Sequence, residues 1–499
     1  MLAHPRSLAL LLTAGVLSGC AVGPDYRPPS IALTATFLGQ QGVEQRPVQG
    51  KAELKRWWAA FDDPLLAHYV TLALEQNLDI SQATARVAQS RAALRYADAA
   101  LLPASNVSAS AARAYQSVET PLGQVLNANP GFDRWGRAYE ANLGASWELD
   151  LFGGLRRGQE AARAEYEASE AGAVATRLAI AAQTADVYVT IRGLQARIAI
   201  AGQQVETRRR LLAMVQLQYD KGVAAELQKN QAEGSLTQAE AQIPVLETGL
   251  NAAMNALDVL LGTQPGTHRA ELAPVKPIPA APALAGTGTP ADMLRRRPDL
   301  IAAERRLAAA SARIGVAVAE YYPKFSLGAL LGSATAIASG NLFSGAASQA
   351  QGVLGLRWRL FDFGRVDAQI AAAHGREAEA LAAYRLAALR ATEDVENAFS
   401  ALVKRDVQVG ILARGESSLA KARDNSFAAY QGGVVSLIEV LDADGNLLQA
   451  RDAKAQAQTE AARAAIASFR ALGGGWDARD ADGQRLAGNL STTSDGNAK

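Results

Sequence analysis

The hydrophobic residues of this chain follow two different periods. From Ile180 to Tyr219 the mainly apolar positions step alternately by four and three residues, the heptad spacing of a helix that packs along its whole length. A second seam runs from Leu236 to Leu260. The proline-free segment 153–218 has 66 residues and would form a helix of about 100 Å at about 1.5 Å per residue. The pattern therefore predicts long coiled-coil helices, and Pro244 is expected to kink the second seam rather than end it.

Other segments alternate between apolar and polar residues. Between Tyr139 and Leu151 every odd-numbered residue is apolar, and the even positions carry mainly glutamate, asparagine, serine and aspartate. The same alternation recurs at 325–331 and 354–360. A period of two predicts strands with one apolar and one wet face. Strands of about ten residues with such faces fit an outer-membrane barrel with a polar lumen.

The chain also contains an internal duplication. Three motifs recur 211 residues later: Trp147–Gly153 as Trp358–Gly364, Tyr219–Gly222 as Tyr430–Gly433, and Leu261–Gly262 as Leu472–Gly473. Upstream, 78–103 matches 298–323 at an offset of 220, so the first copy carries nine extra residues between its proline and its tryptophan. Such length variation is typical of a loop. Each copy therefore predicts a helix, a strand, a loop, a strand, a very long helix, a break and a long helix.

The duplication predicts four strands per chain. A closed barrel needs about eight strands before its interior has room for side chains, and open strand edges are not viable in lipid. The chain is therefore expected to oligomerise. Two alternatives stay open at this point, because the helical seams also fit a structural coiled coil with no transport role and the alternation also fits a soluble, half-buried sheet.

Composition supports long helices and excludes several classes of partner. Hydrophobic residues make up 49% of the chain and aromatic residues only 6%, in an alanine-rich mixture typical of coiled coils. The formal net charge of +1 gives no basic surface for nucleic acid. After residue 20 there is no uninterrupted apolar run of about twenty residues, so any membrane crossing is expected to use strands.

The N-terminus has the layout of a cleaved secretory signal. Arg6 lies in a short polar start, an apolar run extends from Leu8 to Leu17, and small residues follow. The sequence Leu-Ser-Gly-Cys ending at Cys20 resembles the lipobox of bacterial lipoproteins, which implies a covalent lipid such as palmitate on Cys20. Because Cys20 is the only cysteine, the chain can form no intrachain disulfide. Ala21, the next residue, favours sorting to the outer membrane by the same resemblance.

Candidate catalytic chemistry is sparse. His68, His268 and His374 each lack a second histidine or cysteine at the spacing of metal ligands. The Gly286-Thr-Gly288 sequence lacks the third glycine of a nucleotide fingerprint. We expect no enzyme activity, no metal site and no cofactor other than the covalent lipid on Cys20.

The duplicated strand pairs and long helices, the lipobox, the two Tyr-x-x-Gly breaks and the closing Leu472–Trp476 together resemble the TolC-like outer membrane factor family. The resemblance is closest to its lipoprotein branch, the outer membrane efflux lipoproteins of resistance-nodulation-division systems. It implies a mixed α and transmembrane β fold: a homotrimer whose twelve-stranded β-barrel continues into a periplasmic α-helical barrel. It also implies a location in the outer membrane, contact with outer membrane lipid, a periplasmic adaptor (membrane fusion) protein and an inner-membrane pump.

The domain organisation follows from the duplication and the resemblance. The expected segments are a signal peptide (1–19), a lipidated segment and equatorial region (20–62), repeat 1 (63–262, hairpin 103–151), an inter-repeat linker in the equatorial belt (263–289), repeat 2 (290–476, hairpin 323–363) and a disordered tail (477–499).

A candidate gate follows the second helix break. By resemblance, Ile438, Glu439 and Asp442 match apolar and acidic positions that line the periplasmic constriction, with Tyr430 beside them. Glu439 and Asp442 are three residues apart and would share a helix face, although two solvated surface acids would look the same. Three copies around an axis would favour cations.

The chain departs from some relatives at the tip. Val435 stands where those relatives have a locking arginine, and Gln228 stands at the matching acidic position. We therefore expect no charged lock here and a closed state that depends on Ile438, Leu227 and hydrogen bonds from Tyr430. The remaining site predictions are the helix-break residues Tyr219, Gly222, Tyr430 and Gly433, and the membrane-interface aromatics Trp147, Phe152, Tyr322, Trp358 and Phe363.

Three functions remain. The chain could be a passive exit duct for drugs or other toxic small molecules in a tripartite efflux system, a duct for type I protein secretion or metal-ion efflux, or a non-conducting brace of the envelope. Lipidation and the Gly-Gly-Gly-Trp ending favour the pump-linked duct by resemblance. The sequence does not identify the substrate.

Overall fold

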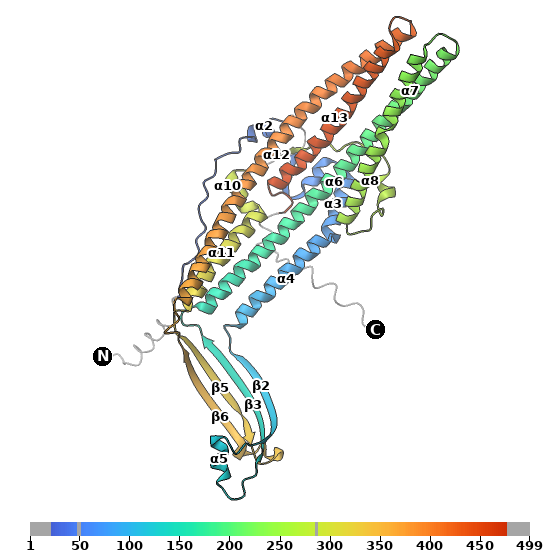
Figure 1. Ribbon diagram of the computed structural model, residues 1–499. Coiled ribbons are helices and arrows are strands. Elements are labelled where there is room, and N and C mark those ends of the chain that lie inside the picture. Colours follow the sequence, from blue (N-terminus) through green and yellow to red (C-terminus); the bar gives the residue numbers. More distant parts are fainter. Residues whose placement is uncertain (1–20, 47–50, 285–287, 477–499) are drawn as a thin grey trace. The chain divides into compact units, whose positions relative to one another are not determined.

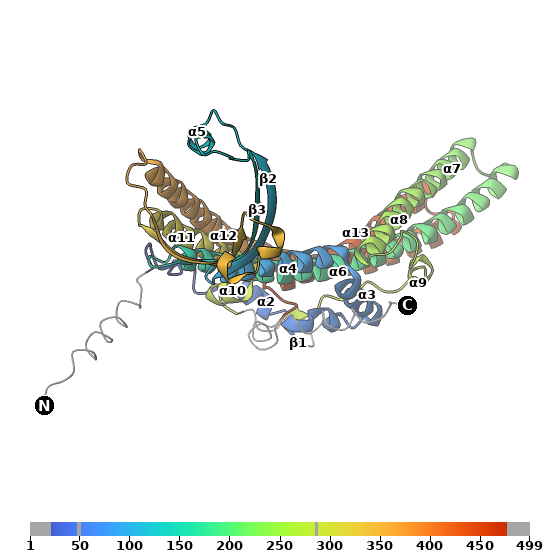
Figure 2. The same ribbon diagram turned by 90° about the horizontal axis from the view of Figure 1, so that it is seen from below.

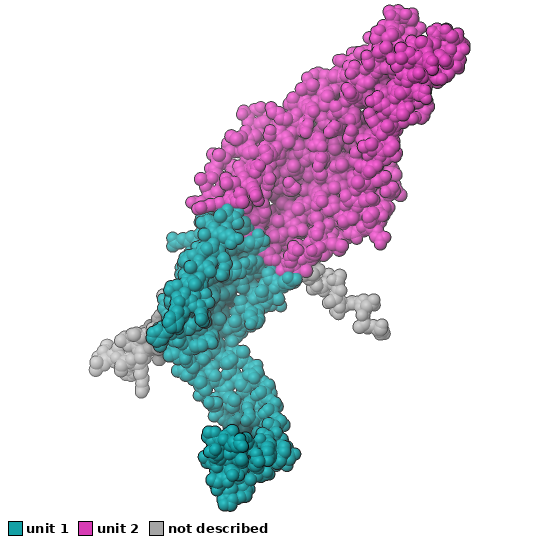
Figure 3. Space-filling model, viewed as in Figure 1, with its two compact units in different colours: residues 1–29, 88–168, 303–383 teal, residues 30–87, 169–302, 384–499 magenta. Residues whose placement is uncertain are grey.

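A computed structural model describes residues 21–46, 51–284 and 288–476. They fall into two compact units, shown in Figure 3. The strand unit takes its described residues from Met1–Pro29, Ala88–Ala168 and Ala303–Ala383. The helical unit takes them from Ser30–Val87, Ser169–Ala302 and Tyr384–Lys499.

The strand unit contains a four-stranded antiparallel sheet in the order β2-β3-β5-β6. Its strands are β2 (Ala104–Tyr115), β3 (Trp135–Leu149), β5 (Lys324–Thr335) and β6 (Ser348–Arg357). Helix α5 (Pro121–Asn127) lies in the β2–β3 loop, whereas the shorter β5–β6 loop holds two 3-10 turns, η2 (Ser339–Asn341) and η3 (Gly345–Ala347). The extra length of the first copy is therefore in a loop, as expected.

The register places most of the large apolar residues of the four strands on one face, with Leu330 and Val353 as exceptions. Leu143 of β3 lies opposite Val107 of β2 and Leu331 of β5, and Leu331 lies opposite Ala350 of β6. The other face is polar, and on it Gln349 Nε2 donates to Asn142 Oδ1 at 2.7 Å. The prediction of one apolar and one wet face is confirmed.

The second hairpin is shorter than the alternation predicted. Trp358 and Leu360 continue the apolar pattern, but β6 ends at Arg357, which pairs with the first residue of β5, Lys324. Pro323 precedes Lys324 and has no N–H to extend the ladder. β6 therefore stops where its partner stops. The prediction that this strand includes Trp358 and Leu360 is wrong.

The helices recur in two matching series. The first comprises α4 (Leu78–Ala99), α6 (Gly154–Asp220), α7 (Glu226–Glu240) and α8 (Gln242–Leu260), and the second comprises α11 (Pro298–Ala319), α12 (Arg365–Gln431) and α13 (Leu437–Ala471). Shorter helices are α2 (Gln40–Glu44), η1 (Leu54–Phe61), α3 (Pro64–Gln76), α9 (Arg269–Leu272) and α10 (Pro290–Arg296). Helices α6 and α12 have 67 residues each. The prediction of four strands with long helices in two tandem repeats is confirmed.

The predicted heptad seam lies along α6. From Ile180 to Val215 every position of the seam is buried or half-buried, and only its last residue, Tyr219, is exposed. The second seam is divided between α7 and α8 at Ala241, whose φ of −64° and ψ of −18° remain helical, so Pro244 marks a kink as expected. Helices α7 and α8 run back along the C-terminal part of α6 (Figures 1 and 2). Within the described ranges no helix is both long and apolar enough to cross a membrane.

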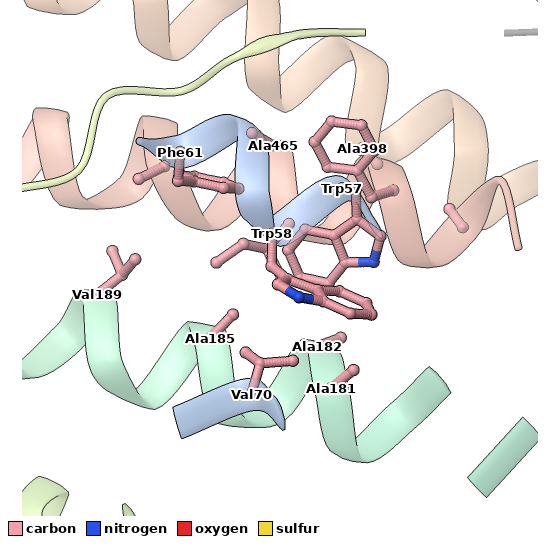
Figure 4. Packing of buried hydrophobic residues seen from close by; sticks show 14 of the residues in the cluster. Trp57, Trp58, Phe61, Val70, Ala181, Ala182, Ala185, Val189, Ala398 and Ala465 are labelled. Atoms are coloured by element: carbon pink, nitrogen blue, oxygen red, sulfur yellow. The ribbon is translucent and has the colours of Figure 1, made fainter. Parts of the chain in front are cut away.

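The core of the helical unit is built on tryptophan and alanine. Trp57 is almost fully buried and stacks on Phe469, with 5.4 Å between ring centroids, while Trp58 meets Trp57 edge-on at 5.6 Å. In Figure 4 these rings lie among short side chains, including Ala182, Ala185 and others labelled there. Alanines let the long helices approach closely enough to enclose the large rings.

The Gly-Gly-Gly-Trp ending packs against this core. A Cβ on Gly474 would lie only 3.0 Å from the carbonyl oxygen of Leu54, and Gly475 N donates to the same oxygen at 2.7 Å. Trp476 Nε1 donates to the carbonyl of Arg296 at 3.1 Å. The motif therefore closes the end of α13 onto the N-terminal segment.

The duplication is also visible as matching contacts. Asn77 Nδ2 donates to Leu260 O at 2.8 Å, and Arg297 Nη1, 220 residues after Asn77, donates at 3.1 Å to Ala471 O, 211 residues after Leu260. Both bonds hold the end of a long helix against the start of another. Different side chains therefore make the same connection in the two copies.

One small element was not predicted. Strands β1 (Lys51–Ala52) and β4 (Ala283–Leu284) form a two-stranded parallel sheet that joins the N-terminal segment to the inter-repeat linker. Two residues are too few to show any period.

Candidate duct and gate

Both long helices end in the same backbone motif. After α6, Val223 N donates to Gln218 O at 2.8 Å, and after α12, Val434 N donates to Ala429 O at 2.9 Å. Gly222 and Gly433 have φ of +72° and +73°. This is the Schellman arrangement, in which a left-handed residue ends a helix and glycine adopts that conformation without strain. The two Tyr-x-x-Gly motifs are therefore helix C-caps that reverse the chain at the tip.

Four helices pack together just behind these turns. Leu211 and Val215 of α6, Ala232 of α7 and Leu437 of α13 form a buried cluster, against which Tyr430 of α12 packs. A short apolar cluster therefore joins the two turns of one chain.

The two tyrosines have different roles. Tyr430 Oη donates to Gln218 Oε1 at 2.9 Å and so links α12 to α6. Tyr219 is more exposed, and Lys229 Nζ lies 5.3 Å from the centre of its ring. Tyr430 thus makes a hydrogen bond between helices. Tyr219 has no equivalent acceptor, because the residue that matches Gln218 in the second copy is Ala429.

The candidate gate residues point away from the core of their own chain. The buried face of α13 carries Leu437, Val440, Asp444 and Leu447, spaced by three and four. Ile438 lies off this face and is 50% exposed, and Glu439 and Asp442 are exposed too. Within one chain the tip is packed by Leu437 rather than by Ile438 or Leu227, which is also exposed. These side chains are free to meet a neighbouring copy or a pore.

The two acids of the candidate gate are not equivalent. Glu439 Oε1 accepts from the N–H of Ser436 at 3.3 Å and from its hydroxyl at 3.4 Å, which is a capping box at the start of α13. Asp442 makes no hydrogen bond or ion pair with the described part of the chain. Of the two acids, Asp442 is therefore the one whose charge is not engaged by the described residues.

Charged contacts between helices exist, but not at the positions considered from the sequence. Val435 is apolar, and Gln228 Oε1 accepts from Ala225 N at 3.0 Å as a cap of α7. Two turns beyond Ser436, Asp444 of α13 lies buried, with Arg208 Nε of α6 at 3.6 Å from its Oδ2.

Asp444 is held by neighbours from two helices. Gln204 Nε2 of α6 donates to Asp444, and Arg423 of α12 attracts it electrostatically. Burial raises the pKa of Asp444 above its ordinary value, against the opposite effects of Gln204, Arg208 and Arg423. The sequence signal for this site was available: Asp444 continues the spacing of Leu437, Val440 and Leu447, and a charge on a buried face needs a partner.

Further ion pairs join the helices along their length. Arg197 binds Asp452 through two contacts of 2.7 and 3.0 Å, and Glu416 of α12 meets Lys454 at 2.8 Å and Arg451 at 3.2 Å. The hydrogen bond from Lys454 is the largest influence that lowers the pKa of Glu416. These pairs connect α13 to α6 and to α12.

The predicted interface aromatics gather where strands meet helices. Phe152 and Tyr322 stack with 4.6 Å between ring centroids. Trp147 Nε1 donates to Leu101 O at 2.9 Å, and its counterpart Trp358 donates to Tyr321 O at 3.0 Å. Phe363 is fully exposed. All five predicted aromatics thus belong to one end of the sheet.

Cys20 lies outside the described residues, but the chain that follows it is held in this region. Val22 N donates to Phe152 O at 3.0 Å. The buried guanidinium of Arg157 donates to Val22 O at 3.1 Å and to Asp25 Oδ1 at 2.7 Å. A Cβ on Gly315 would come within 2.8 Å of Val22 O. The segment after Cys20 is therefore fixed beside the interface aromatics.

The histidines make isolated contacts. His268 Nδ1 lies 2.7 Å from Asp258 Oδ1, His374 Nδ1 lies 3.8 Å from Glu377 Oε2, and His68 packs against Tyr69. In the portion of the chain that the structure describes, no three histidine, cysteine or acidic residues lie together as metal ligands would.

A family model described as "Outer membrane efflux protein" matches residues 69–263 and 289–474, one match to each copy of the duplication. The chain belongs to the outer membrane efflux protein family. This confirms the predicted membership of the TolC-like outer membrane factors, the outer membrane location and the role in efflux. The family consists of transport channels.

Individual relatives match this efflux protein over almost its whole length. "Pyoverdine export outer membrane protein OpmQ" of Pseudomonas putida is 30% identical and covers 95% of this chain and 98% of its own. "Cation efflux system protein CusC" of Escherichia coli O157:H7 is 28% identical and covers 95% and 99%. The solved outer-membrane channel OprN is 34% identical, with a TM-score of 0.83 over 92% of this chain and 100% of its own.

Proposed function

We propose that three copies of this efflux protein form one passive exit duct through the outer membrane. The observation that carries the proposal is the sheet. It has an apolar face on all four strands, and its outer strands β2 and β6 each have one unpaired edge. Unpaired backbone groups cost several kcal/mol each in lipid. Three copies would join these edges into a closed barrel of twelve strands with the polar face inward.

The helical tip would then be the gate. In a trimer, Ile438 and Asp442 of each copy would face the same axis, because they point away from the core of their own chain. Tyr430 would hold α12 against α6 in the closed state. Opening would require these helices to move apart, and a periplasmic adaptor connected to an inner-membrane pump of the resistance-nodulation-division type would drive that movement.

The lipid on Cys20 would be an auxiliary anchor. The fixed segment after Cys20 would deliver its acyl chains beside Phe152 and Tyr322, at the level where the membrane begins. The apolar face of the sheet would itself help to hold a trimer in the membrane. Acylation would therefore serve mainly placement and assembly.

The cargo would be small molecules, with metal ions as the second candidate. The exposed, unpaired Asp442 favours cations, and one relative is by name a cation efflux protein while another exports pyoverdine. The family does not restrict the cargo further, because the pump selects it.

A deletion strain tests the proposed function. We expect its minimal inhibitory concentrations to fall for a set of drugs or for metal salts, and a plasmid copy of the gene to restore them. Loss of a secreted protein with unchanged susceptibility would instead support type I secretion. Unchanged export with altered envelope stiffness would support the brace, and either result would contradict the efflux duct.

A further inference from the structure

Two arginines lie directly opposite each other on the apolar face of the sheet. Arg113 of β2 pairs in register with Arg137 of β3, so both side chains share the face that carries Val107, Leu143 and Trp147. Like charges at directly opposed positions destabilise a sheet. Both arginines are exposed. An anion bound between the two arginines would offset this repulsion.

The pair lies at a specific height on the sheet. Along β3, ten residues separate Arg137 from Trp147, and the intervening residues on the same face are Tyr139, Ala141, Leu143 and Ala145, none of them charged. Ten residues span about 33 Å along a strand. If the strand is tilted by about 40° from the barrel axis, this length corresponds to a height of about 25 Å, which is the height of the apolar band of a transmembrane barrel. Trp147 marks one boundary of this band, and the arginines mark the other.

Two aromatic rings and a third arginine complete the cluster. Arg113 Cζ lies 4.6 Å from the ring centre of Trp135, Arg134 Cζ lies 4.1 Å from that of Tyr115, and the two rings are 5.1 Å apart. Tyrosine and tryptophan are typical of membrane interfaces because they have an apolar body and a polar end. We call Arg113, Arg134, Arg137, Tyr115 and Trp135 the arginine–aromatic cluster.

No carboxylate of the described residues neutralises this cluster. None of its arginines forms an ion pair with any residue that the structure describes. Of the nearby acids, Glu140 points to the opposite face, Glu119 lies in the loop, and Asp133 Oδ1 accepts from Trp135 N at 2.9 Å. The sequence has no acid at all from 321 to 361. A neighbouring copy could therefore offer no carboxylate from its second hairpin.

We propose that the arginine–aromatic cluster binds the phosphate groups of an anionic lipid in the outer leaflet of the outer membrane. Guanidinium groups form paired, charge-assisted hydrogen bonds with phosphate, and the acyl chains of the lipid would cover the apolar residues between Tyr139 and Trp147. The proposal rests on the proposed function only in requiring that this face of the sheet meets lipid. Its test does not involve transport.

The test uses the purified full-length protein in detergent, with diphosphorylated lipid A as the probe and native mass spectrometry as the readout. Replacing both opposed arginines (R113Q/R137Q) should weaken lipid A binding roughly tenfold or more. The control is Arg357→Gln, which replaces an exposed arginine on the polar face of the same sheet. It should change the affinity for lipid A by less than about twofold. Lipid A without phosphates should bind the original protein weakly. Its affinity should not exceed the affinity of diphosphorylated lipid A for R113Q/R137Q.

Single substitution of Arg137 separates binding from folding. In lipid-free detergent Arg137→Gln should keep or raise the thermal midpoint, because it removes the repulsion from Arg113. It should nevertheless reduce the increase in midpoint that lipid A produces. Equal lipid A binding by the original protein and R113Q/R137Q would overturn the proposal. Binding of inorganic phosphate as tight as that of lipid A would also overturn it, because the site would then take a free anion. Neither result would affect the duct.

Discussion

Asp444 and Asp442 are two residues apart on α13 but have opposite surroundings. Asp444 is 4% exposed and lies among Gln204, Arg208 and Arg423, whereas Asp442 is exposed and unpaired among the described residues. The raised pKa of Asp444 shows that burial outweighs the attraction of the arginines. Such a buried pair gives little net stability, but removing one partner leaves the other charge buried and unpaired.

We therefore predict that Asp444→Ala destabilises the protein by about 3 kcal/mol. The matched control Asp442→Ala should change stability by less than about 0.5 kcal/mol, as surface substitutions usually do. Denaturant unfolding in detergent, followed by circular dichroism, measures both. Similar effects of the two substitutions would contradict the buried contact between α13 and α6.

The ion pairs of Glu416 with Arg451 and Lys454 predict that the stability of the protein depends on pH. Its pKa is lowered from 4.5, with the hydrogen bond from Lys454 as the largest cause. A carboxylate with a lowered folded-state pKa contributes stability above its unfolded pKa and loses it as the pH falls through the lower, folded value. Glu416→Gln should therefore lower the thermal midpoint at pH 7, and its difference from the original protein should shrink as the pH falls below about 4.5.

The control for this measurement is Asp442→Asn, which changes an exposed acid that has no ion pair among the described residues. The thermal midpoint of Asp442→Asn should equal that of the original protein at every pH. A difference for Glu416→Gln that stays constant down to pH 3 would show that the effect is not due to ionisation.

At the scale of elements, the helix turns at the tip depend on single glycines. Gly432 and Gly433 are adjacent, but only Gly433 has a left-handed backbone, with φ of +73°. A Cβ on Gly433 would meet nothing within 4 Å, and one on Gly432 would make ordinary contacts, the nearest at 3.5 Å from Ala429 O. The two positions therefore differ in backbone conformation rather than in available space.

Gly433→Ala should consequently destabilise the tip by about 1 to 2 kcal/mol, the cost of a left-handed conformation for a residue with a side chain. Gly432→Ala should be close to neutral. Hydrogen exchange of the amides at the end of α12 measures the effect locally. Equal protection in both variants would mean that the turn is not held by the conformation of Gly433.

Elements with a long, regular pattern could be predicted from the sequence, and those defined by a few contacts could not. The seam from Ile180 repeats often enough to predict α6, and strict alternation from Tyr139 predicted both faces of β3. The end of β6 depends on Pro323, which precedes its partner strand β5, and the pairing of β1 with β4 depends on two residues in each. The burial of Asp444 could have been predicted from its spacing, but its partners could not, since they are on α6 and α12.

At the scale of the whole molecule, anchoring and conduction would be separate properties. The segment after Cys20 is fixed by Arg157 beside Phe152 in the strand unit, whereas the candidate gate residues belong to the helical unit. Cys20→Ser, behind a signal that still permits export, should therefore reduce the yield of trimers in the outer membrane more than their conductance. Membrane fractionation and single-channel recording of the inserted trimers measure these two quantities. Reduced conductance in correctly inserted trimers would contradict an auxiliary role of the lipid.

The proposed gate would belong to the assembled trimer, because Ile438 and Asp442 point away from the core of their own chain. Ile438 and Asp442 are exposed on α13. The carboxylate of Asp442 has no partner among the described residues, whereas that of Glu439 caps its own helix. Ile438→Ala combined with Asp442→Ala should therefore raise single-channel conductance in planar bilayers. Asp442→Asn alone should reduce cation selectivity more than Glu439→Gln does, since a carboxylate held by Ser436 contributes less to the potential along the axis. Unchanged conductance in the double variant would place the constriction elsewhere, and a larger effect of Glu439→Gln would mean that its capping contact does not persist in the trimer.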